Sequence, residues 1–505
     1  MASLLAIGTT DAHAEFVKRL VFESGTEGYN IYRIPTIVQA ANGDLLAFAE
    51  ARSGGDASEI DIVMKRSTNN GDSWGTLQVV VENNNYRGWD GLPLTNVTAG
   101  NQTPVVDHLD PQNPGRIWMP FTLENDRVFV TYSDDHGATW EFDANGRARE
   151  ITADVKLPSW GWYATGPVHG IQLTRGEDAG RLIIPSDHRA DGWGSHVVYS
   201  DDHGVTWELG AVDTRSAEDP AHPNENVATE LVDGRVYFNA RDQHGTSEGN
   251  RVIAYSSDGG ESYDSPFAPA PEFVTPVVQN SVIRFRSVDT GDSENILIHS
   301  GPGQADSRND MTISVSYNES ESWGKRTLIH AGPSAYSDLV KIDSDHFGVL
   351  WEAGDSLYEE ILFGYMSIDD LDPTAFNGID GDVNQDGIVN IDDLNHFIDV
   401  WEPYSDKQFL GGVDNYTNGD LNFDNTQNIY DAALLRQYLL NAGVPTDGLQ
   451  ALFQPIPEPS AVVLSAIGGC YLLRGRLAPR TSLISDIFGS AVDNSTTAPG
   501  QLGTR

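Results

Sequence analysis

The octet SDDHGVTW, Ser200–Trp207, repeats almost letter for letter the octet SDDHGATW at Ser133–Trp140. Three more stretches share the pattern: STNNGDSW from Ser67, SSDGGESY from Ser256 and the degraded SYNESESW from Ser316. The first residues of these octets are 66, 67, 56 and 60 positions apart. A period of this length, with no helical pattern inside it, is too long for most solenoids and suits one four-stranded blade of a β-propeller.

Each octet follows an apolar or alternating run of the kind that forms a β-strand. The runs are DIVMKR, RVFVTY, SHVVY, RVIAY and MTISV. A last pair of runs without an octet, HFGVLWEAG and EILFGYMSI, indicates a sixth unit. The early run FVKRLVF (16–22) is expected to add the outer strand of that unit and so to close the ring without an open edge. The sequence predicts an all-β fold, a six-bladed β-propeller.

The octets themselves are interpreted as structural. Their Asp can fold its carboxylate back onto backbone N–H groups, their Gly permits a positive φ, and the aromatic residue packs under the turn. Asn69 and Asn318 stand where the other octets have Asp, and Ser320 stands where they have Gly. A catalytic group would not tolerate this variation, whereas a turn staple does. The chemistry must therefore come from other residues.

Composition restricts the classes of partner. The chain has 31 Lys and Arg against 74 Asp and Glu, a formal charge of -43, which repels nucleic acid and anionic membranes. Its single cysteine, Cys470, excludes an intrachain disulfide. Nucleic acid is not expected as a partner.

The octets together with YRIPTIV (32–38) resemble the exo-α-sialidase (neuraminidase) family with its Asp-box, or BNR, repeats. The resemblance runs over roughly residues 16–371. It implies that three arginines bind the carboxylate of a sialic acid: Arg33, Arg241 in RVYFNAR and Arg308 in GPGQADSRND. No catalytic cofactor is implied.

The resemblance also implies the catalytic groups. Tyr336 in SAYSDL matches the family's nucleophile, and Glu225, sixteen residues before Arg241, matches the glutamate that polarises it. Glu230 in the same stretch is the competing candidate. Asp56, on the Gly-rich loop of EARSGGDASEIDIV, matches the acid/base aspartate, and this choice over Asp61 and Glu59 rests on its position in the loop. Residues of lower rank are Glu50, Glu352 and Glu360 as supports for the arginines and Trp89 and Asp90 as possible sugar contacts.

The chemistry explains these residue types. Because sialic acid carries its own carboxylate at the anomeric carbon, a carboxylate nucleophile would be repelled, whereas a neutral tyrosine beside a carboxylate avoids that cost. Guanidiniums bind a carboxylate in bidentate geometry and stay charged. The implied function is a retaining exo-α-sialidase that acts on sialylated glycans. The alternatives are a non-catalytic sialic-acid-binding propeller and a glycosidase acting on another nonulosonic or acidic sugar.

A second unit follows the propeller, over residues 378–443, with a linker at 444–456. GDVNQDGIVNIDD and GDLNFDNTQNIYD place oxygen ligands with the spacing of EF-hand calcium loops and each precedes a helical run. This pattern resembles the dockerin family, which implies a small α-helical EF-hand-like module, bound Ca²⁺ and a cohesin-like protein partner. The candidate ligands are Asp382, Asn384, Asp386 and Asp393 in the first loop and Asp420, Asn422, Asp424 and Asp431 in the second.

Both ends of the chain look like targeting segments. Residues 1–14 are interpreted as a signal peptide remnant. PEPSAVVLSAIGGCYLLRGR (457–476) resembles the PEP-CTERM sorting signal, and 477–505 is predicted to be a disordered tail. The resemblance implies a protein exported by a bacterium to its surface or surroundings, with transient membrane association through the sorting segment.

Overall fold

In this computed structural model the described residues are 17–87, 97–244, 246–324, 326–368, 371, 381–384, 388–401, 418–419, 421, 427, 429–446 and 449. Several predictions lie outside them: the segments 1–14 and 457–505, Trp89 and Asp90, and the calcium ligands Asp386, Asp420, Asn422 and Asp424. Among the described helices, none combines the length and the apolar character needed to cross a membrane.

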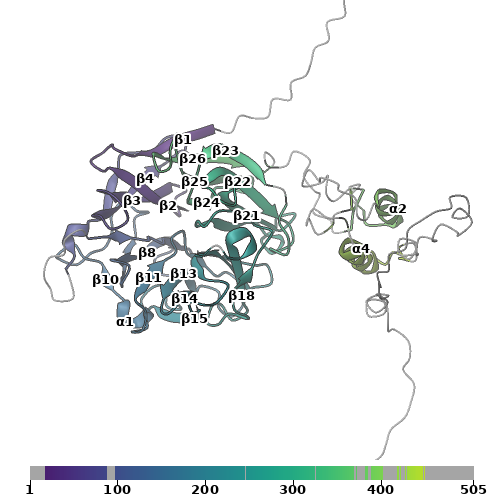
Figure 1. Cartoon of the computed structure of the whole chain (residues 1–505), viewed down its shortest axis with the longest axis horizontal. Coiled ribbons are helices and arrows are strands. Elements are labelled where there is room, and N and C mark those ends of the chain that lie inside the picture. Colours follow the sequence, from purple (N-terminus) through teal and green to yellow (C-terminus); the bar gives the residue numbers. More distant parts are fainter. Residues whose placement is uncertain are drawn as a thin grey trace, which may run out of the picture. The chain divides into compact units, whose positions relative to one another are not determined.

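Six antiparallel sheets follow one another along the chain, which confirms the predicted six-bladed β-propeller (Figure 1). Blade 1 consists of β2 (Ile31–Gln39), β3 (Leu45–Arg52), β4 (Ile60–Ser67) and β5 (Gln78–Val81). Blade 2 consists of β6 (Ala99–Gly100), β7 (Val105–Asp107), β8 (Arg116–Leu123), β9 (Arg127–Ser133) and β10 (Arg149–Glu150). Blade 3 consists of β11 (Trp162–Thr165), β12 (Ile171–Gln172), β13 (Leu182–Arg189), β14 (Trp193–Ser200) and β15 (Glu208–Thr214).

The second half of the ring repeats the plan. Blade 4 consists of β16 (Pro223–Glu230), β17 (Val236–Asp242), β18 (Arg251–Ser256) and β19 (Ala268–Pro269). Blade 5 consists of β20 (Ser281–Arg286), β21 (Ile296–Pro302), β22 (Asn309–Ser316) and β23 (Thr327–Pro333). Blade 6 consists of β24 (Ser337–Lys341), β25 (His346–Ala353), β26 (Glu360–Ser367) and, from the start of the chain, β1 (Val17–Glu23). Short helices lie in the connections: α1 (Thr152–Val155), η1 (Asn83–Asn85), η2 (Glu248–Asn250) and η3 (Val288–Thr290).

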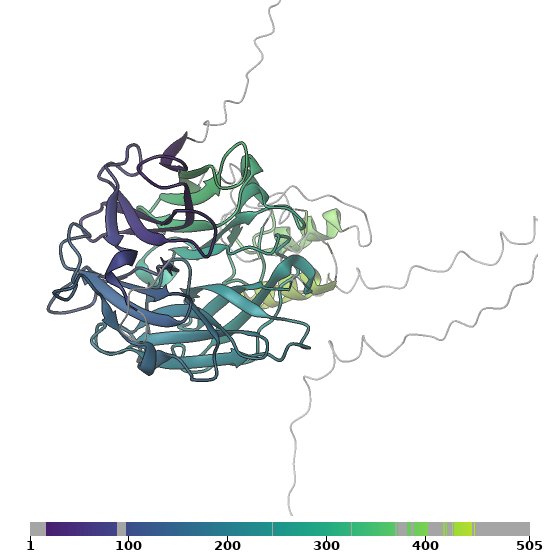
Figure 2. The same cartoon turned by 60° about the vertical axis from the view of Figure 1, so that its left-hand side comes forward.

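The ring closes through its first strand. β1 pairs antiparallel with β26, with Val17 opposite Tyr365 and Glu23 opposite Glu360. The earliest strands, in purple, and the last strands of the propeller, in green, therefore lie side by side (Figure 2). The prediction for FVKRLVF is confirmed, and because β1 covers the outer edge of β26, that strand is not left open to pair with another chain.

The apolar core is divided among the contacts between neighbouring blades. Phe48 of β3 packs with Phe121 of β8 between blades 1 and 2, and Phe22 of β1 and Phe363 of β26 pack with blade 1 where the ring closes. Similar clusters join each of the four remaining pairs of neighbouring blades. Each blade is thus stabilised by both of its neighbours, so the ring buries its apolar surface only when all blades are in place.

The octets make the turns between the third and fourth strands, and their hydrogen bonds repeat from blade to blade. In SDDHGVTW, Ser200 Oγ accepts from the N–H of Gly204 at 2.8 Å and Asp202 Oδ1 accepts from the N–H of Thr206 at 2.7 Å. The degraded octet keeps the second bond through Asn318 Oδ1, which accepts from the N–H of Ser322 at 3.0 Å. The amide oxygen of Asn thus replaces the carboxylate, because the turn needs only an acceptor at this position.

The glycine of the octet also seats the turn on the preceding blade. Gly204 has φ +80°, and a Cβ added there would lie 2.1 Å from the ring of Trp118 on β8. In the same manner, a Cβ added to Gly71 would lie 1.9 Å from the ring of Phe363 on β26. The octet therefore pins its own hairpin and holds two blades together, which explains why the motif recurs with the blade period.

Two helices lie in the second unit of the sequence, α2 (Ile391–Val400) and α4 (Ile429–Asn441). Asn390 caps α2 in a capping box with Asp393. The carboxylate of Asp393 also accepts from the N–H of Asn384 at 3.1 Å, and the carboxylate of Asp431 accepts from the N–H of Leu421 at 2.8 Å. The aspartate at the last position of each predicted calcium loop is thus hydrogen-bonded to the backbone near the start of the same loop.

Replacing Gly204 by Ala is expected to destabilise the propeller strongly. The left-handed backbone alone costs about 1–2 kcal/mol for a residue with a Cβ, and overpacking against Trp118 adds roughly 1–3 kcal/mol. The matched control is Gly25→Ala, because Gly25 has φ +84° and no atom within 4 Å of the added Cβ. Denaturant unfolding of both variants separates the two costs; equal losses of unfolding free energy would contradict the docking role of the octet glycine.

Candidate active site

All six residues that the family resemblance implied line one cavity of about 270 Å³. The cavity also receives side chains from every blade, so it exists only in the closed ring. The six are Arg33, Asp56, Glu225, Arg241, Arg308 and Tyr336. The structure therefore brings together groups that are up to about three hundred residues apart in the sequence.

Two register shifts, or β-bulges, lie at residues that line the cavity. The register of β2 against β3 shifts between Arg33 and Thr36, where Ile34 has φ 56°. The register of β16 against β17 shifts between Pro223 and Asn226, which sets Glu225 apart from the regular ladder. A bulge inserts an extra residue and changes the direction of its side chain, and bulges are common beside active sites.

Tyr336, Glu225 and Arg241 form a tight group. The hydroxyl of Tyr336 donates to Glu225 Oε1 at 2.6 Å, and Arg241 Nη1 lies 2.9 Å from the same hydroxyl and 2.7 Å from Glu225 Oε2. Burial, reinforced by the charge of Glu225, raises the pKa of Tyr336 despite the opposing arginines. The phenol is therefore neutral in the free protein, with its proton directed at a carboxylate.

A single carboxylate positions Arg33 beside Tyr336. Glu352, on β25, accepts from Arg33 Nε at 2.7 Å and from Arg33 Nη2 at 3.2 Å. The same carboxylate accepts from the N–H of Ile34 at 2.9 Å and from the N–H of Tyr336 at 3.2 Å. The Glu352 side chain is fully buried. It therefore joins blade 1 to blade 6 through two residues that line the cavity, Arg33 and Tyr336.

Arg308 is held by neutral groups. Its Nη1 donates to the hydroxyl of Tyr358 at 2.8 Å and its Nη2 donates to the carbonyl of Val277 at 3.0 Å. No carboxylate of the described residues forms an ion pair with Arg308. The Tyr358 ring also lies 3.9 Å from Cζ of Arg33, so one aromatic side chain contacts two of the three arginines.

Asp56 lies at the mouth of the cavity with its side chain 85% exposed. Arg52 Nη1 donates to its Oδ1, and Arg33 Nη1 is 3.7 Å from the same atom. Partial burial disfavours ionisation of Asp56, but Arg52, Arg33 and Arg308 outweigh it and hold the pKa of this carboxyl below its usual value. In the free protein Asp56 is thus an exposed, charged carboxylate facing cations.

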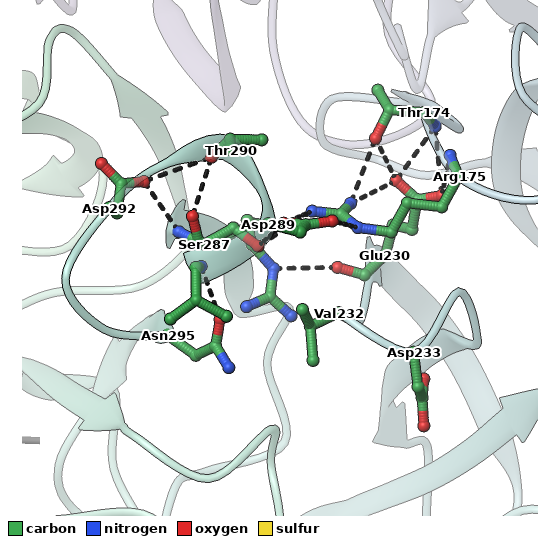
Figure 3. Close-up of polar contacts among 12 residues, drawn as sticks. Thr174, Arg175, Glu230, Val232, Asp233, Ser287, Asp289, Thr290, Asp292 and Asn295 are labelled. Carbon is green, nitrogen blue, oxygen red and sulfur yellow. Dashed lines mark hydrogen bonds and ion pairs between the residues drawn. The ribbon is translucent and has the colours of Figure 1, made fainter. Parts of the chain in front are cut away.

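The competing acidic residues occupy other places. Glu230, at the far end of β16 from Glu225, accepts from Arg175 N at 2.9 Å and from Arg175 Nη1 at 2.6 Å, and it belongs to a network that continues through Asp289 (Figure 3). Asp61 accepts from the N–H of Asn83 at 2.8 Å. Neither of these carboxylates, nor Glu59, lines the cavity. Glu230 and Asp61 each fasten one segment of the chain to another.

The predicted supports for the arginines have mixed outcomes. Glu352 does hold Arg33, whereas Glu50 holds Arg52, which is not one of the three arginines, with Nε to Oε2 at 2.9 Å. The suggestion for Glu360 was wrong, because its neighbouring charges are Glu23, Glu359 and Asp355, all acidic. Its place at the start of β26, opposite Glu23 in the ladder, explains the error.

Sequence reasoning missed Arg52, Tyr358 and Asp187. Arg52 carries a weak signal, because it stands two positions after Glu50 on a strand and so shares its face. Tyr358 and Asp187 carry none, since only the closed ring brings them to the cavity or to its arginines. Trp162 and Trp193 also line the cavity, with ring centroids 5.5 Å apart.

Comparisons with known proteins agree with the fold and the order of the two units along the sequence. Residues 43–349 match the BNR repeat-like domain family, and residues 380–440 match the dockerin type I domain. A sialidase of Micromonospora viridifaciens is 32% identical over 346 residues, which covers 66% of this chain and 51% of that protein. A sialidase of Bacteroides fragilis is 25% identical, with 66% of this chain and 62% of that protein covered.

The solved structure named Hadza microbial sialidase Hz136 has a TM-score of 0.60 and 25% identity, and the match covers 70% of this chain and 69% of that chain. The chain spans between half and two thirds of the length of the two curated relatives above. With the repeats, the closed six-bladed ring and the family match over more than half of the sequence, the chain belongs to the BNR-repeat sialidase family and carries a dockerin type I domain after its propeller.

Proposed function

We propose that the protein is a retaining exo-α-sialidase that hydrolyses terminal α-linked sialic acids from glycoconjugates. The observation that carries this proposal is the 2.6 Å hydrogen bond from the Tyr336 hydroxyl to Glu225, in a cavity that also holds three arginines. A protein that only bound an acidic sugar would need the arginines but not a phenol paired with a carboxylate. The relatives named sialidase support the same reaction class.

The arginines bind the carboxylate of the sugar. Nε and Nη2 of Arg33 donate to Glu352. Of its nitrogens, Nη1 is the one nearest to Asp56 and remains for the ligand. Arg308, with no carboxylate as partner among the described residues, offers an uncompensated positive charge. Bidentate binding of a carboxylate by guanidinium is strong and directional, so it fixes the orientation of the ring.

In the first chemical step, the Tyr336 oxygen attacks the anomeric carbon while Glu225 takes the phenolic proton. The glycosidic bond breaks, and Asp56 gives its proton to the leaving oxygen, so the aglycone departs as an alcohol. In the second step, Asp56 takes a proton from water, the water oxygen attacks the anomeric carbon, and the Tyr336 oxygen leaves and recovers its proton from Glu225. Two inversions give net retention.

Asp56 must be protonated to act as the acid, although Arg52, Arg33 and Arg308 keep it ionised in the free protein. The carboxylate of the bound sugar would neutralise part of the charge of Arg33 and Arg308. The remaining cation nearest to Asp56 is then Arg52, so Arg52 sets how readily the acid accepts its proton.

The dockerin region is proposed to bind Ca²⁺ and, through its surface, a cohesin-like protein. The described part of the first loop fits a hard cation, because the carboxylates of Asp382 and Asp393, its first and last ligand positions, are both fully buried. Asp393 also orders the loop through the N–H groups of Asn384 and Asn390. Export from a bacterium and transient membrane contact through residues 457–476 are proposed on the sequence alone.

Tyr336→Phe is expected to lower kcat at least ~10³-fold, because the nucleophile is removed, while binding of the planar dehydrated sialic acid analogue is retained. The measurement is release of a fluorogenic aglycone from an α-sialoside, together with NMR of the first sugar anomer released by the wild type. Tyr86→Phe is the control, since Tyr86 is also buried, its hydroxyl accepts from the N–H of Ala148, and it does not line the cavity. Turnover by Tyr336→Phe would refute the nucleophile, and no release by the wild type between about pH 4 and pH 8 would favour a binding propeller.

Arg52→Gln is expected to raise the pKa of Asp56 toward its usual value, because the closest cation is lost. A larger fraction of Asp56 is then protonated at each pH, so the alkaline limb of the kcat/KM profile moves to higher pH. The profile and the ¹³C NMR titration of the Asp56 carboxyl measure this shift. Arg66→Gln, which breaks an ion pair with Asp44 elsewhere in blade 1, is expected to leave both curves unchanged. A shift to lower pH in Arg52→Gln would contradict the assignment.

Calorimetric titration of the full chain is expected to detect calcium uptake. Asp393→Asn should weaken the affinity of the first loop roughly tenfold or more, because a charged ligand is replaced by a neutral one. Asp392→Asn is the matched control, since its exposed side chain is adjacent in the sequence and is not in a ligand position. Equal losses in the two variants, or no uptake by the wild type, would argue against the calcium loop.

A further inference from the structure

One more carboxyl group, outside the proposed mechanism, lines the cavity near Glu225. Asp187, on β13, has no exposed surface and lines the same cavity. Its Oδ1 accepts from Asn224 Nδ2 at 2.6 Å and from Trp162 Nε1 at 3.1 Å. Its Oδ2 is buried and has no hydrogen-bond partner among the described residues.

These contacts suit a carboxylic acid better than a carboxylate. A buried carboxylate needs an ion pair or donors on both oxygens, because removal from water is costly for the charged form. Arg241 is the cation that acts on Asp187, but it is already paired with Glu225 at 2.7 Å. The side-chain donors on Asp187 both reach Oδ1, which leaves Oδ2 as the place for a proton.

The balance of charges around the cavity also favours the neutral acid form of Asp187. Four guanidiniums, those of Arg33, Arg52, Arg241 and Arg308, face four carboxylates, those of Glu50, Asp56, Glu225 and Glu352. An ionised Asp187 would make this group net negative. A cavity that has to attract a sugar carboxylate would then repel it, in a protein whose overall charge is already -43.

We propose that Asp187 is a positioning residue that stays a neutral acid while the site works. Through Oδ1 it orients Asn224 and Trp162, and by remaining uncharged it lets Glu225, the residue after Asn224, carry the negative charge beside Tyr336. The inference deepens the proposed sialidase function and rests on it for the identity of the ligand. The protonation state of Asp187, however, can be measured without any activity.

The protonation of Asp187 is expected to make the affinity for an anionic ligand depend on pH. The charged and titratable groups that face Asp187 are Glu225 of β16, Arg241 of β17 and the phenol of Tyr163 on β11, and its ladder partner on β14 is Ser195. Burial, with the charge of Glu225 added, raises the pKa of Asp187 well above its usual value. As pH rises through that pKa, a new negative charge appears in the lining of the cavity, so an anionic ligand should bind more weakly at high pH.

The test compares wild type with Asp187→Asn, because an asparagine keeps an acceptor and a donor in the arrangement of the neutral acid. Affinity for the planar dehydrated sialic acid analogue is measured from about pH 5 up to the highest pH at which the protein stays folded, a range in which Asp56 is already ionised. In the wild type the affinity is expected to fall roughly tenfold or more as Asp187 ionises. In Asp187→Asn it should equal the wild-type value at about pH 5 and stay constant.

Infrared difference spectra provide the second readout. The wild type should show a protonated carboxyl near neutral pH that is missing from Asp187→Asn. Asp107→Asn is the control, because Asp107 is also fully buried but accepts from the N–H groups of Leu109 and Asp110, so its removal should lower stability and leave the affinity profile unchanged. If Asp187→Asn does not fold, Asp187→Ser replaces it in both measurements.

The outcomes separate this inference from the proposed function. A wild type without the protonated carboxyl near neutral pH, or an Asp187→Asn variant whose affinity falls at high pH as the wild-type affinity does, would overturn the role of Asp187. A wild type that shows the carboxyl but does not bind the sialic acid analogue would overturn the proposed function and leave the protonation of Asp187 established.

Discussion

The carboxylate of Glu352 is the constraint on which the site depends. It receives two bonds from Arg33, one from the N–H of Ile34 and one from the N–H of Tyr336, and it is fully buried. A buried charge of this kind is tolerated only when all of its partners are in place, because an incomplete set leaves an unpaired ion in a medium of low dielectric. Closure of the ring, which brings blade 6 to blade 1, therefore also places Arg33 next to Tyr336.

The propeller and the site are stabilised by different means. The octet turns and the apolar clusters between blades hold the ring, and they tolerate replacement of Asp by Asn because each needs only an acceptor or an apolar surface. The site instead depends on the bulges in β2 and β16 and on close ion pairs such as Arg241 with Glu225, which need both charged partners. A strained backbone at Ile34 persists because the surrounding contacts determine it.

Carboxyl groups in the site differ because their surroundings differ. Asp56 is exposed and faces three arginines, so its pKa is lowered, whereas Asp187 is buried beside Glu225 and its pKa is raised. Tyr336 is kept neutral by burial next to Glu225. One cavity thus contains a charged acid at its mouth, a neutral phenol at its centre and, as we propose, a neutral acid in its wall, each set by solvent access and by the nearest charge.

The sequence alone determined the blade count, the octet turns and the closure by FVKRLVF, because these follow from local periodicity and turn chemistry. It also pointed to six site residues, through motifs rather than distances. Only the tertiary structure decided that Glu225 and not Glu230 faces Tyr336, that Glu50 holds Arg52, and that Tyr358 and Asp187 take part. The physical reason is that the two ends of one strand, such as β16, look alike in sequence, while long-range ion pairs and burial arise only when distant strands meet around a closed ring.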